Sequence, residues 1–187
     1  PSPAGDRRKR LLAVLIGLTI LRGIIYAAVV PPWQAPDEPQ HLQRAVLAAT
    51  GDLLVSRQEA YASRELINAV HRSMIDHRFW FFRAHSMPAE EPEYVAAFGH
   101  PPLYYALCGL VLGPLQTASL PLQLYAMRLL GALLSAGSVA LAFAVARRVF
   151  PHRQDMAGAT TALVMLHPMR TFIDASANND SLAALLS

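Results

Sequence analysis

Two short stretches of the chain carry side chains whose types and spacing could do chemistry. The first is Pro36-Asp37-Glu38-Pro39, and His41 follows Asp37 after about one helical turn. The second is His100-Pro101-Pro102-Leu103-Tyr104-Tyr105. A carboxylate beside an imidazole can act as a general base that removes a proton from a hydroxyl or amine acceptor. If the leaving group is a lipid phosphate, it departs as a stable anion, so one carboxylate suffices, whereas glycoside hydrolysis uses two.

Other common chemistries have no pattern in this sequence. It contains no Gly-rich phosphate loop, no Cys-x-x-Cys pair and no Gly-x-Ser-x-Gly elbow. The seven histidines include no His-x-x-x-His pair, so a structural zinc site is not expected. The single cysteine, Cys108, excludes an intrachain disulfide. The sequence fixes no cofactor and leaves a requirement for a divalent metal open.

The composition is that of a membrane protein. Hydrophobic residues make up 53% of the chain and charged residues only 16%, below the ~25% usual in soluble domains. The basic residues flank apolar segments, at 7–10 and at Arg147-Arg148, which follows the positive-inside rule and argues against a nucleic-acid partner. We therefore expect a multi-pass protein of the cell membrane with a cytoplasmic N-terminus. The chain starts without Met and stops inside the apolar run that ends at Ser187, so we expect the N-terminal part of a longer protein.

The apolar segments predict an all-α fold, a polytopic α-helical membrane protein with interfacial helices in a large first extracytoplasmic loop. Leu11–Val30 is long enough to span a bilayer, since twenty residues cover the ~30 Å hydrocarbon core. We predict an outer loop over 31–121, then spans over Leu122–Phe150 and Met156–Ile173. A further span begins in 181–187, capped by Asn178-Asn179-Asp180. Together these segments form the N-terminal part of one transmembrane domain, over 1–187.

The outer loop has local helical signals of its own. Asp37 is a plausible N-cap for a helix over Glu38–Thr50, because Pro39 falls in the first turn and Gly51 follows the end. Capping alone is the simpler interpretation of Asp37, and it competes with the catalytic one. Apolar residues at helical spacing predict an amphipathic helix in 57–78, and the aromatic run 79–82 is typical of residues at the headgroup level or in a buried core.

The segment Leu103–Leu115 is apolar but only thirteen residues long. A run of ~10–14 residues more often lies at the interface or re-enters than spans. If it spanned, Arg147-Arg148 would end outside the cell, against the positive-inside rule. We therefore place this segment on the outer surface. Arg128 and Arg170, at the outer ends of two spans, are then positioned to hold a lipid phosphate by bidentate hydrogen bonds.

The chain resembles the start of the GT-C-type membrane glycosyltransferases, which include protein mannosyltransferases and the aminoarabinose transferases of lipid A. The resemblance rests on an acidic residue in the first outer loop, a Pro-Pro-Leu-Tyr-Tyr-like segment, an Ala-Arg-Leu-like span start and a cytoplasmic Ala-Arg-Arg-like end. Here these are Asp37-Glu38, His100–Tyr105, Ala126–Leu129 with Met127 inserted, and Ala146–Arg148; the pair Asn179-Asp180 resembles the start of the fourth span. His100 stands where a Lys is common, so a permanent cation is not assured there.

The pattern Pro31-Pro32-x-x-x-Pro-Asp-Glu-Pro-x-His is closer still to a bacterial family of predicted membrane proteins with this architecture. The GT-C resemblance implies an inverting transferase that moves a sugar from a polyprenyl-phosphate donor to a lipid, glycan or protein acceptor on the outer side. Asp37 would be the base. Glu38 and His41 would support the base or bind the acceptor. The donor phosphate would contact His100, Arg128 and Arg170. A lipid-facing cavity would be lined by Tyr104 and Tyr105.

Two other functions remain open from the sequence. A transporter or flippase of lipid-linked sugars would keep the cavity but would not need Asp37 as a base. A membrane assembly or binding subunit would need neither. Loss of transfer on replacing Asp37, with the protein still folded, separates the transferase from both alternatives.

Overall fold

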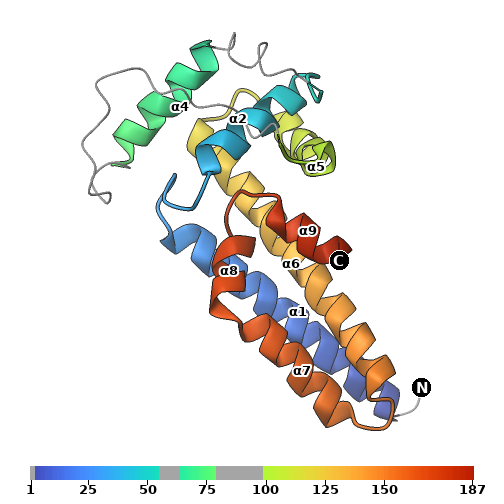
Figure 1. Cartoon of the computed structure of the whole chain (residues 1–187). Coiled ribbons are helices and arrows are strands. Elements are labelled where there is room, and N and C mark those ends of the chain that lie inside the picture. Colours follow the sequence, from blue (N-terminus) through green and yellow to red (C-terminus); the bar gives the residue numbers. More distant parts are fainter. Residues whose placement is uncertain (1–2, 55–63, 79–98) are drawn as a thin grey trace.

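The computed structural model describes residues 3–54, 64–78 and 99–187, and every regular element in these ranges is a helix. The predicted all-α fold is therefore confirmed. Figure 1 shows two parts. Helices α1, α6 and α7 run alongside one another in an elongated bundle, and α2, α4 and α5 gather at one end of α6.

Two helices are long and apolar enough to cross a membrane, α1 (Pro3–Val29) and α6 (Leu120–Val149). Each contains all but the last residue of a segment predicted to span, and α1 begins eight residues before the expected start. The two helices pack along their length, and Gly23 of α1 lies so close to α6 that a Cβ there would overlap the Cβ of Ala132. Their small residues therefore let the two backbones approach closely.

The segment expected to be one span over Met156–Ile173 is divided in the structure. Helix α7 covers Gln154–Leu166, and the short helix α8 covers Pro168–Asp174. His167 between them has an extended backbone, with ψ of 114°. The physical reason is Pro168, whose ring disfavours the helical conformation of the residue before it.

The segment predicted as the outer loop contains α2 (Glu38–Ala49), α4 (Arg64–Asp76) and α5 (Pro102–Leu112), with a 3-10 turn over Gly113–Leu115. Helix α2 begins at the predicted residue and ends one residue before the predicted end. Helix α4 covers the described part of the helix predicted over 57–78, while the start of that helix and the aromatic run 79–82 lie outside the described residues. Helix α5 has eleven residues, so it is too short to span as a helix; its place at the interface stays a prediction.

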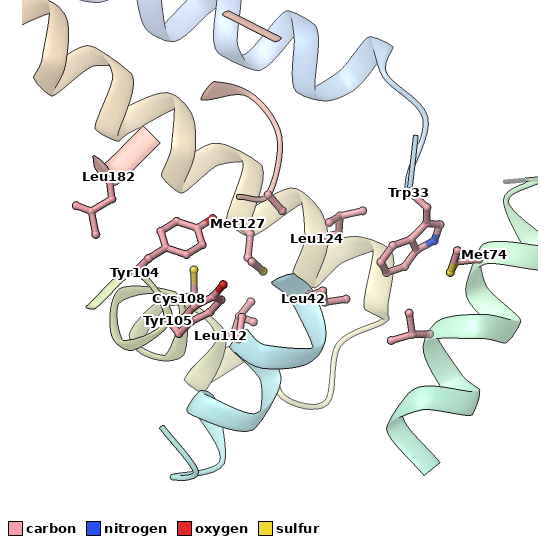
Figure 2. Close-up of a cluster of buried hydrophobic side chains, with 13 residues drawn as sticks. Trp33, Leu42, Met74, Tyr104, Tyr105, Cys108, Leu112, Leu124, Met127 and Leu182 are labelled. Carbon is pink, nitrogen blue, oxygen red and sulfur yellow. The ribbon is translucent and has the colours of Figure 1, made fainter. Parts of the chain in front are cut away.

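A buried apolar cluster joins these helices to α6 and to α9 (Asp180–Leu186). In Figure 2, Tyr104 of α5 lies between Leu182 of α9 and Met127 of α6. Helix α2 approaches α5 so closely that a Cβ on Gly109 would lie 3.1 Å from the carbonyl oxygen of Ala48. The cluster fixes the start of α2 against the N-terminal part of α6, and the candidate site lies there. Its fully buried members include Trp33, Leu42, Met74, Tyr105, Cys108 and Leu124.

Candidate functional site

A buried ion pair connects the start of α2 to α6. The Nε and Nη2 atoms of Arg128 donate to the two carboxylate oxygens of Glu38 at 2.7 and 2.8 Å, and neither side chain has any exposed surface. This bidentate arrangement is the strongest geometry available to the two groups. Glu38 also accepts the backbone N–H of Ala177 at 3.2 Å, which ties the loop before α9 to the same carboxylate.

Arg128 also holds the connection between α1 and α2. Its Nη1 atom donates to the carbonyl oxygens of Ala27 and Val30, at 2.9 and 2.6 Å, and Nη2 donates to that of Pro31 at 3.0 Å. A guanidinium has five N–H donors, and these three carbonyls with the Glu38 carboxylate take all five. A phosphate could bind Arg128 only by displacing these partners. Arg128 therefore has no free N–H donor for the phosphate that the sequence led us to expect there.

The connection that Arg128 holds contains two residues in the left-handed region. Trp33 has a φ of 71° and Asp37 a φ of 58°. For a bulky aromatic residue this is a genuine outlier, whereas Asp adopts the conformation more readily. Trp33 is fully buried, and its indole N–H donates to the hydroxyl of Ser73 in α4 at 3.3 Å. Packing and the Arg128 bonds therefore impose a backbone conformation that the local sequence does not favour.

Asp37 occupies the N-cap position of α2, as predicted, but its side chain does not cap the helix. The carboxylate is exposed, and it makes no hydrogen bond with the described residues. Glu38 is buried and the adjacent Asp37 is exposed. Asp37 has a left-handed backbone and lies just before the regular helix that begins at Glu38. The simpler interpretation of Asp37, a capping side chain, therefore has no support in the geometry.

His41 is the buried neighbour of Asp37. Its Nδ1 atom is 2.9 Å from the Tyr105 hydroxyl, with the two rings stacked at 6.0 Å, and the ring of His100 lies 5.3 Å away. Burial, followed by the nearby His100, lowers the pKa of His41 to about 4, against the opposing effect of the Asp37 and Asp180 carboxylates. His41 is therefore a neutral imidazole near pH 7, which can share a hydrogen bond but does not carry a positive charge.

The structure adds Asp180, which sequence reasoning treated only as part of a helix cap. It is exposed at the first residue of α9, and its carboxylate is close enough to His41 to oppose the lowering of that pKa. Its backbone N–H donates to the side-chain oxygen of Asn178 at 3.0 Å. His100, on the segment before α5, is also exposed. Asp37, His100 and Asp180 thus surround His41 from three different elements.

Tyr104 and Tyr105 both point into the protein. Burial raises the pKa of both hydroxyls, and it raises the pKa of the Cys108 thiol to about 12, so all three groups stay protonated. The Tyr105 hydroxyl shares a hydrogen bond with His41. The guanidinium carbon of Arg44 lies 5.3 Å from the centroid of the Tyr105 ring. Of the pair, Tyr104 also lines a groove between α5 and α9, together with Pro101, Leu103, Asn179, Leu182, Ala183 and Leu186.

Arg170, expected to bind phosphate, is also paired within the protein. Its Nε atom donates to the carboxylate of Asp174 at 3.1 Å, and Ser135 of α6 donates to the same oxygen at 2.6 Å. Within the described ranges, no group of three or more His, Cys, Asp or Glu side chains is arranged to hold a metal ion.

Comparison with known proteins gives one positive result. A family described as predicted membrane proteins, DUF2142, has a model that matches residues 20–187. No curated protein and no solved structure matches the chain. The match agrees with the resemblance of the Pro-Asp-Glu-Pro loop to a family of predicted membrane proteins.

Proposed function

The chain belongs to the DUF2142 family of predicted membrane proteins, and on that premise we propose that it transfers a sugar from a polyprenyl-phosphate donor to an acceptor on the outer side of the cell membrane. The observation that carries the proposal is the state of Asp37. Its carboxylate is exposed, does not cap its helix, and stands at a left-handed residue beside a fully buried ion pair. Residues held in sparsely populated conformations by their surroundings cluster at functional sites.

In this proposal Asp37 is the general base. It takes the proton of an acceptor hydroxyl or amine as the acceptor atom attacks the anomeric carbon of the sugar. The bond from that carbon to the phosphate oxygen breaks, and the lipid phosphate leaves with the electron pair, which requires no acid. The attack comes from the face opposite the leaving group, so the anomeric configuration inverts.

The groove between α5 and α9 supports the position of the lipid donor. It has about 100 Å³ of free space and a lining that is almost wholly apolar. Its lining includes Pro101 and Asn179, the chain neighbours of His100 and Asp180. An isoprenoid chain in this groove would bring its phosphate to the surface that carries Asp37, where His100 is the contact we propose.

In this proposal Arg128 and Arg170 stabilise the fold and do not contact the donor phosphate. Arg128 has its donors filled by Glu38 and three carbonyl oxygens, so Glu38 and Arg128 hold the connection that presents Asp37. Arg170 is paired with Asp174. His41, neutral near pH 7 and bonded to Tyr105, gives the acceptor a hydrogen-bonding neighbour.

The basic residues at 7–10 and at Arg147-Arg148 lie at the ends of α1 and α6 that are far from α2. The positive-inside rule places these ends in the cytoplasm. Asp37 is then on the outer side of a multi-pass protein, where a lipid-linked sugar and its acceptor meet.

The test uses membrane vesicles that contain the protein and a radiolabelled polyprenyl-phosphate sugar. We expect free polyprenyl phosphate and a labelled acceptor to form with the wild type and with Asp52→Asn, an exposed acid at the far end of α2. Asp37→Asn should form neither. Movement of label across the membrane without release of polyprenyl phosphate would instead identify a transporter, and no change in the labelled lipid would refute both functions.

A further inference from the structure

A small, largely enclosed cavity lies within the helical bundle, between α1, α6, α7 and α8. Its free space of about 10 Å³ is room for the centre of one water-sized sphere. Part of the wall is apolar, and part is an unusual concentration of polar side chains for a membrane-spanning bundle. The polar residues that line it are Thr19, Arg22, Ser135, Arg170, Thr171 and Asp174.

The charges around this cavity do not balance. Arg22 and Arg170 supply two guanidinium groups, whereas Asp174 supplies one carboxylate. Arg22 lies inside the apolar span α1, and its Nη1 atom donates to the carbonyl oxygen of Met165, which is neutral. The described lining therefore has a surplus of one positive charge. A charge inside a membrane protein is costly unless another charge or a polar cavity compensates it.

Arg170 also has a donor with no acceptor. Its Nε atom donates a hydrogen bond to the Asp174 carboxylate, but its Nη2 atom is buried and has no hydrogen-bond partner. Ser135 donates its proton to Asp174 at 2.6 Å, and its oxygen does not accept a hydrogen bond from Nη2 of Arg170. An unsatisfied buried donor on a charged group is among the more expensive features a protein can retain, so a ligand that accepts a hydrogen bond there is favoured.

We propose that this cavity binds one monatomic halide ion, chloride under physiological conditions. A halide supplies the missing negative charge and accepts hydrogen bonds from both guanidinium groups. A space this small favours a monatomic ion over phosphate and sulfate, whose four oxygens need several times that volume. A water molecule would satisfy the free Nη2 donor but would leave the surplus charge. The site is separate from the surface around Asp37, and its existence does not depend on the transferase function.

The test measures the thermal stability of the purified protein in detergent, in sodium gluconate and in sodium chloride or bromide of equal ionic strength. A ligand that binds the folded state alone raises the melting temperature in a saturable way. We expect chloride and bromide to raise it, and sulfate and phosphate to have no such effect at matched ionic strength. Crystals grown with bromide should show one anomalous peak between Arg22 and Arg170.

Two variants should move the halide affinity in opposite directions. Arg170→Gln removes one cation and should weaken it by about tenfold or more. Asp174→Asn removes the competing carboxylate and should strengthen it, a gain that general loss of packing cannot produce. Arg147→Gln, at an exposed arginine in the last turn of α6, should leave it unchanged. Equal melting temperatures in gluconate and chloride, equal stabilisation by phosphate, or weaker halide binding in Asp174→Asn would each overturn the proposal.

Discussion

Breaking the buried Glu38–Arg128 pair is expected to destabilise the packing of α2 on α6. Replacing Glu38 with Gln removes the negative charge and leaves the Arg128 guanidinium fully buried, with three neutral carbonyl acceptors. Breaking a buried pair by removing one partner typically costs ~3–5 kcal/mol. We expect Glu38→Gln to lower the free energy of unfolding by about this amount.

Arg128→Met should cost more than Glu38→Gln. It leaves the Glu38 carboxylate buried without its cation, and it also deprives the carbonyls of Ala27, Val30 and Pro31 of their donor. Each buried polar group left unsatisfied adds about 1–3 kcal/mol. The double variant should cost less than the sum of the two single variants, because each single change already breaks the same pair.

Equilibrium unfolding in detergent micelles measures these differences. The matched control is the ion pair between Arg153 and Asp155, at 2.7 Å, whose side chains are 64% and 65% exposed. Solvent and salt screen such an exposed pair, so Asp155→Asn should change the free energy of unfolding little. If Glu38→Gln is as mild as Asp155→Asn, or if the two single effects add fully in the double variant, the pair does not hold the connection before α2.

Three further outcomes follow from particular contacts. Because the pKa of His41 is lowered from 6.5 to about 4, the unfolded chain binds a proton that the folded chain does not, so acidification from pH ~6.5 to ~4 should reduce the free energy of unfolding by about 3 kcal/mol; this component should disappear in His41→Gln. A cysteine at Ser119 should react with an impermeant thiol reagent only from outside the cell, and a cysteine at His152 only from inside; the reverse pattern would refute the topology. Gly131→Ala should destabilise the protein by ~1–3 kcal/mol, because a Cβ there would overlap the backbone carbonyl of Asp174, whereas Gly17→Ala, with nothing within 4 Å, should be neutral or stabilising; equal effects in unfolding experiments would contradict the close packing of α6 on α8.

The helices were largely predictable because their signals are local. Apolar length identified α1 and α6, and Pro39 and Gly51 marked the ends of α2 within a residue. The exposure of Asp37 and the burial of Glu38 do not follow from the helical repeat alone, because Asp37 precedes the helix with a left-handed backbone. The break between α7 and α8 was also readable in principle, since Pro168 lies in the predicted span.

The contacts around the candidate site were not predictable from spacing. Glu38 and Arg128 are ninety residues apart in sequence, and only the packing of α2 on α6 brings them together. One signal did exist, because an arginine within an apolar helix needs a partner, but nothing in the sequence singled out Glu38 among the acids of the chain. The approach of Asp180 to His41 depends on the chain turning back after α8, so no local pattern indicated it.

In the proposed transfer reaction Asp37, and not Glu38, activates the acceptor. The direct measurement is the single-turnover rate of sugar transfer from a polyprenyl-phosphate donor, normalised to folded protein, for Asp37→Asn and Glu38→Gln. Loss of a general base costs about 10²–10⁴ in rate, so Asp37→Asn should fold normally and lose at least this factor. Glu38→Gln should keep most of its rate per folded molecule despite its lower stability. Full transfer by Asp37→Asn, with Glu38→Gln folded but inactive, would contradict the claim.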